Sequence, residues 1–135
     1  AALGKFFTYE PDILILSSSV YIMSGEEFER YVAALLRANG FSNVQMTKAS
    51  GDYGVDVLAS KDGERYAIQC KRYAKNVGVK SVQEVYAGAP MYKATRCAVI
   101  TNMYFSDNGR TLANKLGVKL WDRTDLMRMM ANVPN

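Results

Sequence analysis

The sequence predicts an α/β domain with a mixed central β-sheet flanked by helices. Two segments have the helical spacing of apolar residues behind a capping box. Between them, two strand-like runs flank an Asp-Gly turn, and the later run Cys97–Thr101 is continuously apolar, as in a strand buried on both faces. The expected order is α-β-β-β-α-β, followed by α-β-α. The length of 135 residues fits one compact domain.

The first helix is expected from Ser24 to the stop signal Asn39-Gly40, because Ser24 and Glu27 have capping-box spacing. Five apolar residues then follow the helical pattern: Phe28, Tyr31, Val32, Leu35 and Leu36. A short strand at Val44–Thr47 and a glycine-containing loop at Lys48–Gly54 should come next. Within that loop we interpret Asp52 as a turn residue rather than a second metal ligand.

A β-hairpin is expected from the runs Val55–Ser60 and Arg65–Arg72. The dipeptide Asp62-Gly63 between them favours a two-residue turn. Lys61 then faces Glu64, and every pair of facing positions sums to 125. This register places Asp56 directly across from Gln69, where facing Cβ atoms lie about 4.5–5.5 Å apart.

The second half of the chain continues the alternation of helices and strands. A helix should begin at Ser81, in a capping box with Glu84, and end or kink at Pro90. Four further elements are expected at Cys97–Thr101 (strand), Ser106–Leu116 (helix stopped by Gly117), Val118–Trp121 (strand) and Thr124–Ala131 (helix). We expect Trp121 in the core, and Met127, Met129 and Met130 in the core or an interface.

Composition excludes several classes of protein. The chain has no histidine, which excludes histidine-based triads and zinc sites. Cys70 and Cys97 lie in apolar runs outside any CxxC pair, so we expect a reducing, cytoplasmic location. The run Ile13–Met23 is shorter than the roughly 20 residues that span a bilayer. A start at Ala1 rather than methionine suggests a fragment of a longer protein with a further N-terminal domain.

Positive charge is concentrated in one segment. The net charge is +4, and residues 65–83 contain five basic residues and no acidic one. The other residues hold 12 basic and 13 acidic side chains, because 17 − 5 = 12. Such a segment is the expected footprint of a nucleic-acid partner. A solvated lysine-rich face is the alternative on charge alone.

Three polar side chains of the hairpin are expected to converge. Strand alternation sends Gln69 and Lys71 to the same face as Asp56. A carboxylate and an amide oxygen are hard ligands suited to Mg²⁺, and a neighbouring ammonium group can orient a water beside a phosphate. From spacing alone, the alternative is that these are ordinary polar residues on a solvated sheet face.

Several short motifs follow one another in a characteristic order. They are Gly25-Glu26-Glu27-Phe28-Glu29, Ser50-Gly51-Asp52-Tyr53-Gly54-Val55-Asp56, Tyr66-Ala67-Ile68-Gln69-Cys70-Lys71-Arg72, Val82-Gln83-Glu84-Val85, Thr101-Asn102 and Leu120-Trp121-Asp122-Arg123. Together they resemble the Mrr-type restriction endonuclease family of the PD-(D/E)xK nuclease superfamily, in its QxK variant. The resemblance implies a restriction-endonuclease-like αβββαβ core. It makes residues 24–135 the nuclease domain and residues 1–23 an extension of unknown role.

The resemblance also implies metal-dependent hydrolysis of DNA that leaves a 5′-phosphate. By motif, Asp56 is the invariant acid and metal ligand, Gln69 replaces the usual Glu or Asp, and Lys71 is the catalytic lysine. Glu29 matches an acidic residue that helps to hold the metal. The implied cofactor is Mg²⁺, with Mn²⁺ able to substitute. Val55 in place of proline, and the neutral Gln69, depart from the superfamily pattern, and Gln69 puts metal affinity in doubt more than activity.

The implied partner is DNA, with or without modified bases, and cutting both strands suggests a homodimer. The residues expected to contact nucleic acid are Lys48, Arg72, Lys75, Lys80, Gln83 and Asn102. Two other functions remain open. One is a DNA-binding module of the same fold that does not cleave, and the other is a nuclease resembling Holliday-junction resolvases.

Overall fold

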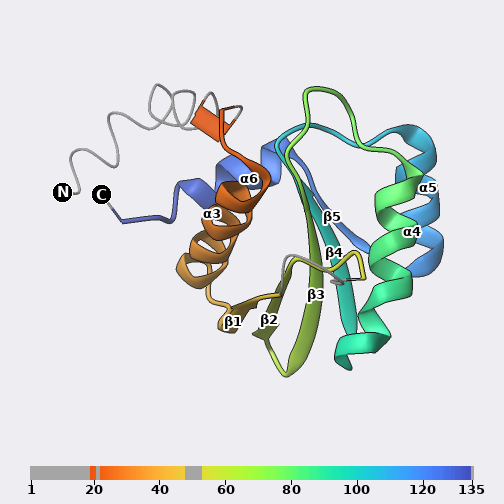
Figure 1. The fold of residues 1–135 in the computed structure, drawn as a ribbon, viewed down its shortest axis with the longest axis horizontal. Helices are drawn as coiled ribbons and strands as arrows, with labels where there is room; N and C mark the ends of the chain where they lie inside the picture. Colours follow the sequence, from red (N-terminus) through yellow and green to blue (C-terminus); the bar gives the residue numbers. More distant parts are fainter. Residues whose placement is uncertain (1–18, 21, 48–52, 135) are drawn as a thin grey trace.

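A five-stranded mixed sheet forms the centre of the molecule (Figure 1). The computed structural model describes residues 19–20, 22–47 and 53–134. The strands are β1 (Ser42–Met46), β2 (Val57–Lys61), β3 (Glu64–Lys71), β4 (Arg96–Thr101) and β5 (Lys119–Trp121), arranged in that order. Pairing is antiparallel for β1–β2 and β2–β3, and parallel for β3–β4 and β4–β5. The predicted mixed sheet and element order are confirmed.

Helices cover both faces of this sheet (Figure 1). They are α3 (Gly25–Ala38), α4 (Val79–Gly88), the 3₁₀ helix η1 (Ala89–Tyr92), α5 (Asp107–Leu116) and α6 (Arg123–Met130). Helices α3 and α6 pack on one face, with Phe28, Leu36 and Leu126 fully buried against strand residues such as Ile68. Helices α4 and α5 pack on the other, where Val82, Val85 and Ala113 meet Ala67 and Val99. The two apolar layers hold the sheet between them.

The local signals explain most element boundaries. Ser24 and Glu27 form the predicted capping box of α3, and Gly40 ends that helix with φ +90°. Gly117, with φ +73°, ends α5 as predicted. Val20 precedes the expected start of the domain, yet it is fully buried in the α3 side of the core.

Two expectations about the second half of the chain are wrong. Helix α4 begins at Val79 behind Gly78, not at Ser81, and it has no side-chain cap. Ser81 is buried within the helix, so it cannot form a capping box with Glu84. Trp121 is only half-buried, because it lines a pocket rather than filling the core.

The sheet has two different ends. Figure 1 shows the β2–β3 hairpin at the bottom, and the loops that follow β3 and β4 together at the top. The two upper loops are joined by a bridge between Val77 and Phe105. No helix in the described part of the chain is long and apolar enough to cross a membrane.

Candidate active site

The β2–β3 hairpin sets the geometry of the candidate site. Asp62 and Gly63 have φ values of +52° and +79°, so the turn has the left-handed residues that a tight hairpin needs. The pairs run from Lys61 with Glu64 to Val57 with Ile68, and each pair sums to 125. The predicted turn and register are therefore confirmed along the whole of β2.

Asp56 does not continue this ladder as a regular pair with Gln69. Its amide donates to the carbonyl of Ile68 at 2.8 Å, although Ile68 is already the partner of Val57. Two residues thus face one, as in a β-bulge. The Asp56 carboxylate turns to accept a 2.8 Å bond from the amide of Cys70. Asp56 therefore contacts the residues on both sides of Gln69, which corrects the expected direct pairing but keeps the two residues adjacent.

Gln69 presents a buried oxygen that accepts no hydrogen bond. The residue is 3% exposed, and its Nε2 donates to Oε1 of Glu84 at 3.1 Å. This bond fixes the amide orientation and leaves Gln69 Oε1 without a hydrogen-bond partner in the described structure. Such an atom costs free energy unless something else contacts it. A hard cation is a partner that suits an amide oxygen.

Lys71 extends from the end of β3 beside the same glutamate. Its Nζ lies 4.0 Å from Oε1 of Glu84 and 5.8 Å from the ring centroid of Tyr73. Glu84 therefore contacts both members of the Gln-x-Lys motif. Glu84 is a candidate site residue that the sequence motifs did not reveal.

Two glycines allow α4 to bring Glu84 to the site. A Cβ on Gly54 would lie 2.9 Å from the Cβ of Glu84, and a Cβ on Gly88 would overlap the carbonyl oxygen of Tyr53. The segment before Asp56 therefore lies directly on α4. The backbone that Gly54 lets approach is that of α4 in the same chain. One signal for Glu84 was present in the sequence, because Glu84 ends the long stretch without acidic residues.

Glu29 approaches from the other face of the sheet. It is half-buried on α3, and Cys70 packs on this face, opposite to Gln69 and Lys71. Burial raises the pKa of the Cys70 thiol well above its usual range, and the charges of Asp56 and Glu29 raise it further. Asp56 contacts Cys70 through the bond to the Cys70 amide, whereas Glu29 lies on α3, on the side of the sheet that Cys70 faces.

Among the described residues, the last part of β3 has no strand partner on the side of β2. From Gln69 to Lys71, β3 pairs with β4 on one side, but β2 on the other side starts only at Val57. Within the described residues, no group of three or more Asp, Glu, Cys or His side chains could hold a metal ion. The candidate ligand set has two carboxylates and one amide instead. The unsatisfied Gln69 Oε1, on the residue between the two that bond to Asp56, suits a divalent cation.

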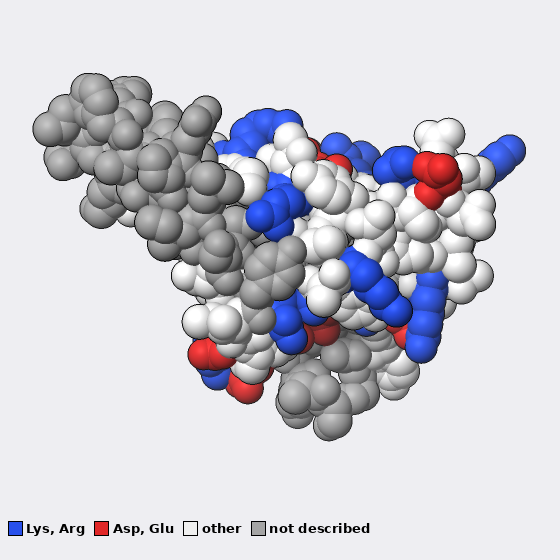
Figure 2. Space-filling view, turned by 90° about the horizontal axis from the view of Figure 1, so that it is seen from above, with Lys and Arg blue, Asp and Glu red and all other residues white. Residues whose placement is uncertain are grey.

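The residues expected to contact nucleic acid fall into three groups. Lys75, Lys80 and Gln83 are exposed, on the β3–α4 loop and the start of α4, and Arg72 is half-buried at the end of β3. Lys48, like Asp52, lies outside the described residues. Figure 2 looks onto this end of the molecule and shows more basic than acidic side chains.

Asn102 belongs to the third group, because it is fully buried. Its Nδ2 donates to the carbonyl of Tyr73 at 2.9 Å, and its Oδ1 accepts from the amide of Tyr73 at 2.8 Å. Both halves of the amide are therefore used to fasten the β3–α4 loop to the end of β4. In this structure Asn102 positions the loop and offers no polar atom to DNA.

The basic segment is not one continuous patch. Arg65 lies at the amino end of β3, where its guanidinium donates to the carbonyl of Asn43 at 2.7 Å and to Ser60 Oγ at 2.9 Å. These bonds tie β1 to the hairpin. The remaining basic residues of the segment lie at the other end of β3, so only they can contribute to a surface near Lys71.

Comparison with known proteins agrees with this fold. An uncharacterised protein of Archaeoglobus fulgidus is 33% identical over 97 residues, which is 66% of this chain and 56% of that protein. The type IV methyl-directed restriction enzyme EcoKMrr of Escherichia coli K12 is 29% identical over 116 residues, 80% of this chain and 38% of that enzyme. The chain thus spans about half or less of each curated relative.

A solved structure has the same architecture. The DNA modification-dependent restriction endonuclease AspBHI matches with a TM-score of 0.71 over 91% of this chain and 35% of that one. The identity is 17%, so the match shows a shared fold. The family model Mrr_cat, described as restriction endonuclease, matches residues 20–130. Because this match covers most of the sequence, the chain belongs to the Mrr-type family of restriction endonucleases.

Proposed function

We propose that this domain hydrolyses DNA phosphodiester bonds with the help of a divalent cation, as the nuclease domain of a restriction endonuclease. The observation that carries the proposal is the buried Gln69 Oε1, which accepts no hydrogen bond in the described structure and belongs to the residue between the two that bond to Asp56. Family membership supports nuclease chemistry. The cation is the step beyond what the family match provides.

Asp56, Gln69 and Glu29 would hold the ion, with Mg²⁺ as the expected cation and Mn²⁺ as a substitute. When bound, such an ion polarises a phosphate oxygen and lowers the pKa of a coordinated water. The chain's own contribution is orientation. The amide of Cys70 fixes the Asp56 carboxylate. Glu84 accepts a hydrogen bond from the Gln69 Nε2, so the oxygen of the Gln69 amide faces away from Glu84.

Lys71 provides a cation that a phosphate or an attacking water can contact. Its side chain is one-quarter exposed, and its ammonium group lies over the ring of Tyr73 and beside Glu84. Glu84 accepts charge-assisted contact from this ammonium group and limits where it can move. We propose that Lys71 orients the water and stabilises negative charge that develops on the phosphate.

The DNA backbone would lie across the end of the molecule in Figure 2. The two loops there are held together, because Val77 N donates to the carbonyl of Tyr104 at 2.8 Å and Ser106 N donates to the carbonyl of Val77 at 2.9 Å. Lys75 and Lys80 are exposed on this pair of loops and the helix that follows. We propose that they contact phosphates without reading sequence.

The target and the assembly belong to the whole protein. EcoKMrr is called methyl-directed and AspBHI modification-dependent. We propose that this domain likewise cuts DNA that carries modified bases, and that two copies act together because each provides one site for one strand.

A nicking assay tests the proposal. The purified chain is incubated with supercoiled plasmid and Mg²⁺ or Mn²⁺, beside Asp56→Asn, Lys71→Ala and the control Lys115→Ala, an exposed lysine on α5. We expect nicked and linear products from the unmodified chain and the control only. Removing the cation with a chelator should stop the reaction.

The outcome that contradicts the proposal is equally specific. If the unmodified chain binds duplex DNA but forms no product with either cation, the domain is a binding module. Matched plasmids with and without methylated bases test the target class. Preferential cutting of four-way junctions over linear duplex would instead indicate a resolvase. Sedimentation of the chain with and without DNA tests the dimer.

A further inference from the structure

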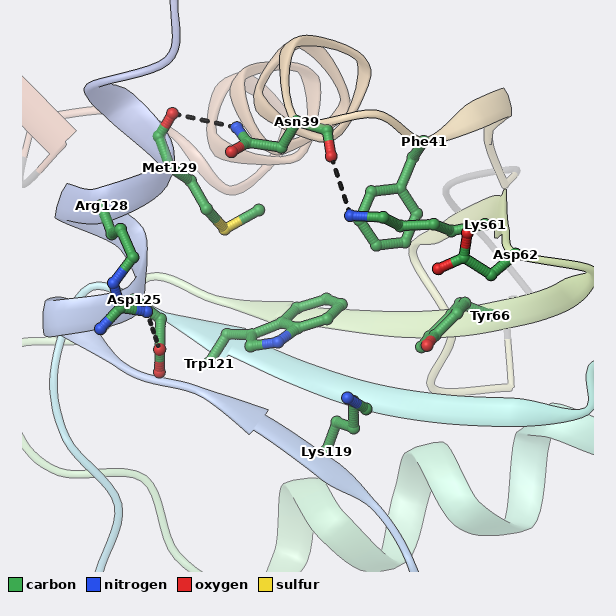
Figure 3. A pocket seen from close by; sticks show the side chains of 10 residues that line it. All are labelled: Asn39, Phe41, Lys61, Asp62, Tyr66, Lys119, Trp121, Asp125, Arg128 and Met129. Carbon is green, nitrogen blue, oxygen red and sulfur yellow. Dashed lines mark hydrogen bonds and ion pairs between the residues drawn. The ribbon is translucent and has the colours of Figure 1, made fainter.

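A pocket lies on the face of the sheet covered by α3 and α6, opposite to the face that carries Gln69 and Lys71. It has a volume of about 310 Å³ and lies between the end of α3, the β2–β3 hairpin, β5 and α6 (Figure 3). Its lining residues are Asn39, Phe41, Lys61, Asp62, Tyr66, Lys119, Trp121, Asp125, Arg128 and Met129. The volume is at the lower end of the range for small-molecule sites, about 300–1,000 Å³. A ligand of nucleoside or mononucleotide size fits this volume.

Three aromatic rings form a continuous apolar surface in the pocket. Their centroids lie 5.5 Å apart for Phe41 and Tyr66, 6.0 Å for Phe41 and Trp121, and 6.2 Å for Tyr66 and Trp121. Tyr66 and Trp121 are inclined by 30°, whereas Phe41 meets both edge-on. Figure 3 shows Trp121 on one side of the opening and Met129 on the other. Such a surface suits a flat ring, because stacking of a base on an aromatic side chain stabilises binding by about 1–3 kcal/mol.

The charged groups of the pocket favour an anion. The lining has three basic and two acidic side chains, a net charge of +1. Asp125 is already paired, because Oδ1 contacts Arg128 at 2.9 Å and Oδ2 accepts from the amide of Asp122 at 2.9 Å. Lys119 is exposed and, among the described residues, forms no ion pair. Its ammonium group is therefore available to a ligand.

The pocket walls are fixed before any ligand binds. Asn39 Nδ2 donates to the carbonyls of Leu35 at 2.8 Å and Met129 at 3.0 Å, which joins α3 to α6. Asn39 Oδ1 accepts from Asn132 at 2.7 Å. Lys61 Nζ donates to the carbonyl of Asn39 at 3.1 Å and lies 5.0 Å from the ring centroid of Phe41. A preformed pocket lowers the entropic cost of binding.

From this juxtaposition we propose that the pocket binds a nucleotide. The base packs against Trp121 and Tyr66, and the phosphate contacts Lys119 at the rim. A ligand with a cationic ring is disfavoured by Lys61 and Lys119, and a purely apolar ligand would leave the charged rim unsatisfied. The nucleotide can be a free molecule or the end of a single strand, since both present the same base and phosphate.

Trp121 is the only tryptophan of the chain, so its fluorescence reports on the pocket directly. The full chain is titrated with the four deoxynucleoside 5′-monophosphates, with a 5′-phosphorylated single-stranded oligonucleotide, and with inorganic phosphate. Excitation at the red edge of the indole absorption avoids absorbance by the bases. Isothermal titration calorimetry on the same samples gives a second measure that does not depend on the fluorophore.

We expect saturable quenching by nucleotides and little effect of phosphate alone. Lys119→Ala should weaken binding about tenfold, the effect of losing one charge-assisted contact. The control Lys115→Ala removes an exposed lysine on α5, across the sheet, and should change nothing. Binding of the free monophosphates identifies a free nucleotide as the ligand. Binding of the oligonucleotide alone identifies a strand end.

Two results would overturn the proposal. One is the absence of both quenching and binding heat with every probe at millimolar concentration, and the other is equal weakening by Lys119→Ala and Lys115→Ala. Circular dichroism of both variants checks that they fold. Asp56→Asn should leave nucleotide binding intact, so a failure of the proposed cleavage reaction does not affect this test.

Discussion

The two ends of strand β3 bury very different side chains. At the carboxyl end, Gln69 is almost fully buried and keeps one polar oxygen without a hydrogen bond in the described structure. At the amino end, Tyr66 is also buried, but its ring is satisfied by contact with Phe41 and Trp121. The first arrangement costs free energy until a partner binds, whereas the second is stable as it stands. A buried polar atom without a partner therefore points to chemistry, and a partly buried aromatic surface that lines a pocket points to recognition.

The supports of the two ends also differ. Glu84 on α4 orients the Gln69 amide at the carboxyl end, on the side of the sheet covered by α4 and α5. Asn39 at the end of α3 orders the pocket at the amino end, on the side covered by α3 and α6. Because different helices support them, variants at one end should leave the other end unchanged.

The sharpest contrast is between Lys71 and Lys119. Lys71→Ala should lower the rate of plasmid cleavage by about 100-fold or more, the usual range for loss of a group that orients or transfers a proton. Lys119→Ala should leave that rate unchanged, because Lys119 lies on β5, two strands away from β3, and lines a pocket on the face opposite to Gln69 and Lys71. Single-turnover rates with both variants measure the difference. A similar loss in both would show that the two ends are not independent.

A larger structural disturbance is expected from Gly88→Ala. The new Cβ would overlap the carbonyl oxygen of Tyr53, and neither backbone can move freely because both are packed. We expect a loss of about 2–3 kcal/mol in the free energy of unfolding by urea, together with reduced cleavage. Gly25→Ala is the matched control, since nothing lies within 4 Å of its new Cβ. Equal stability of the two variants would contradict the close contact between α4 and the segment before Asp56.

The role of Glu84 can be tested by exchanging the two partners. Gln69→Glu alone puts a second carboxylate beside Glu84 and should lower the stability of the metal-free chain by about 1–2 kcal/mol. In the double variant with Glu84→Gln, the new amide at position 84 donates to the new carboxylate at position 69. The hydrogen bond is thus restored in the reverse direction, and stability should recover. A double-mutant cycle of urea unfolding in a chelator measures this coupling. Additive effects would mean that the Gln69–Glu84 bond does not fix the amide.

The smallest effect is expected at the start of α3. Ser24→Ala removes the side-chain half of a capping box and should lower stability by about 1 kcal/mol without changing either end of β3. Urea unfolding measures the stability of the variant, and the nucleotide titration measures binding in the pocket. Altered nucleotide binding in this variant would link the cap to the pocket.

The other half of that box depends on pH. The backbone hydrogen bond from Ser24 lowers the pKa of Glu27 below its usual value, and the bond from the Ser24 side chain adds to this. A carboxyl group with a lowered pKa stabilises the folded state at pH values above its usual pKa. This stability is lost as the pH falls through the lowered pKa of the folded state. The stability difference between the unmodified chain and Glu27→Gln should therefore shrink in acid. Unfolding curves at neutral and acidic pH check the sign.

Local signals explain why so much of the fold was predictable. The Asp62-Gly63 turn fixed the hairpin register, and Ser24 and Gly117 fixed helix ends, because each depends on only a few neighbouring residues. The start of α4 was wrong for the opposite reason. Ser81 has the spacing from Glu84 that is typical of a capping box, but it is buried within the helix.

The candidate site was predicted only in part, for a similar reason. Asp56, Gln69 and Lys71 follow from the hairpin, whereas Glu84 reaches them through contacts of α4 with Tyr53 and Gly54. Tertiary contacts of this kind leave no periodic pattern. Tryptophan in an apolar run is typical of a core residue. Only the arrangement of α3, β5 and α6 shows that Trp121 lines a pocket.

The neutral amide at position 69 has one further consequence for the proposed reaction. A carboxylate there would give the ion its full complement of negative charge in the resting protein. With an amide, part of that charge must come from the phosphate of the substrate. We therefore expect the cation and DNA to bind cooperatively, each raising the affinity of the other by the same factor. The domain would then bind little of the cation until DNA is present.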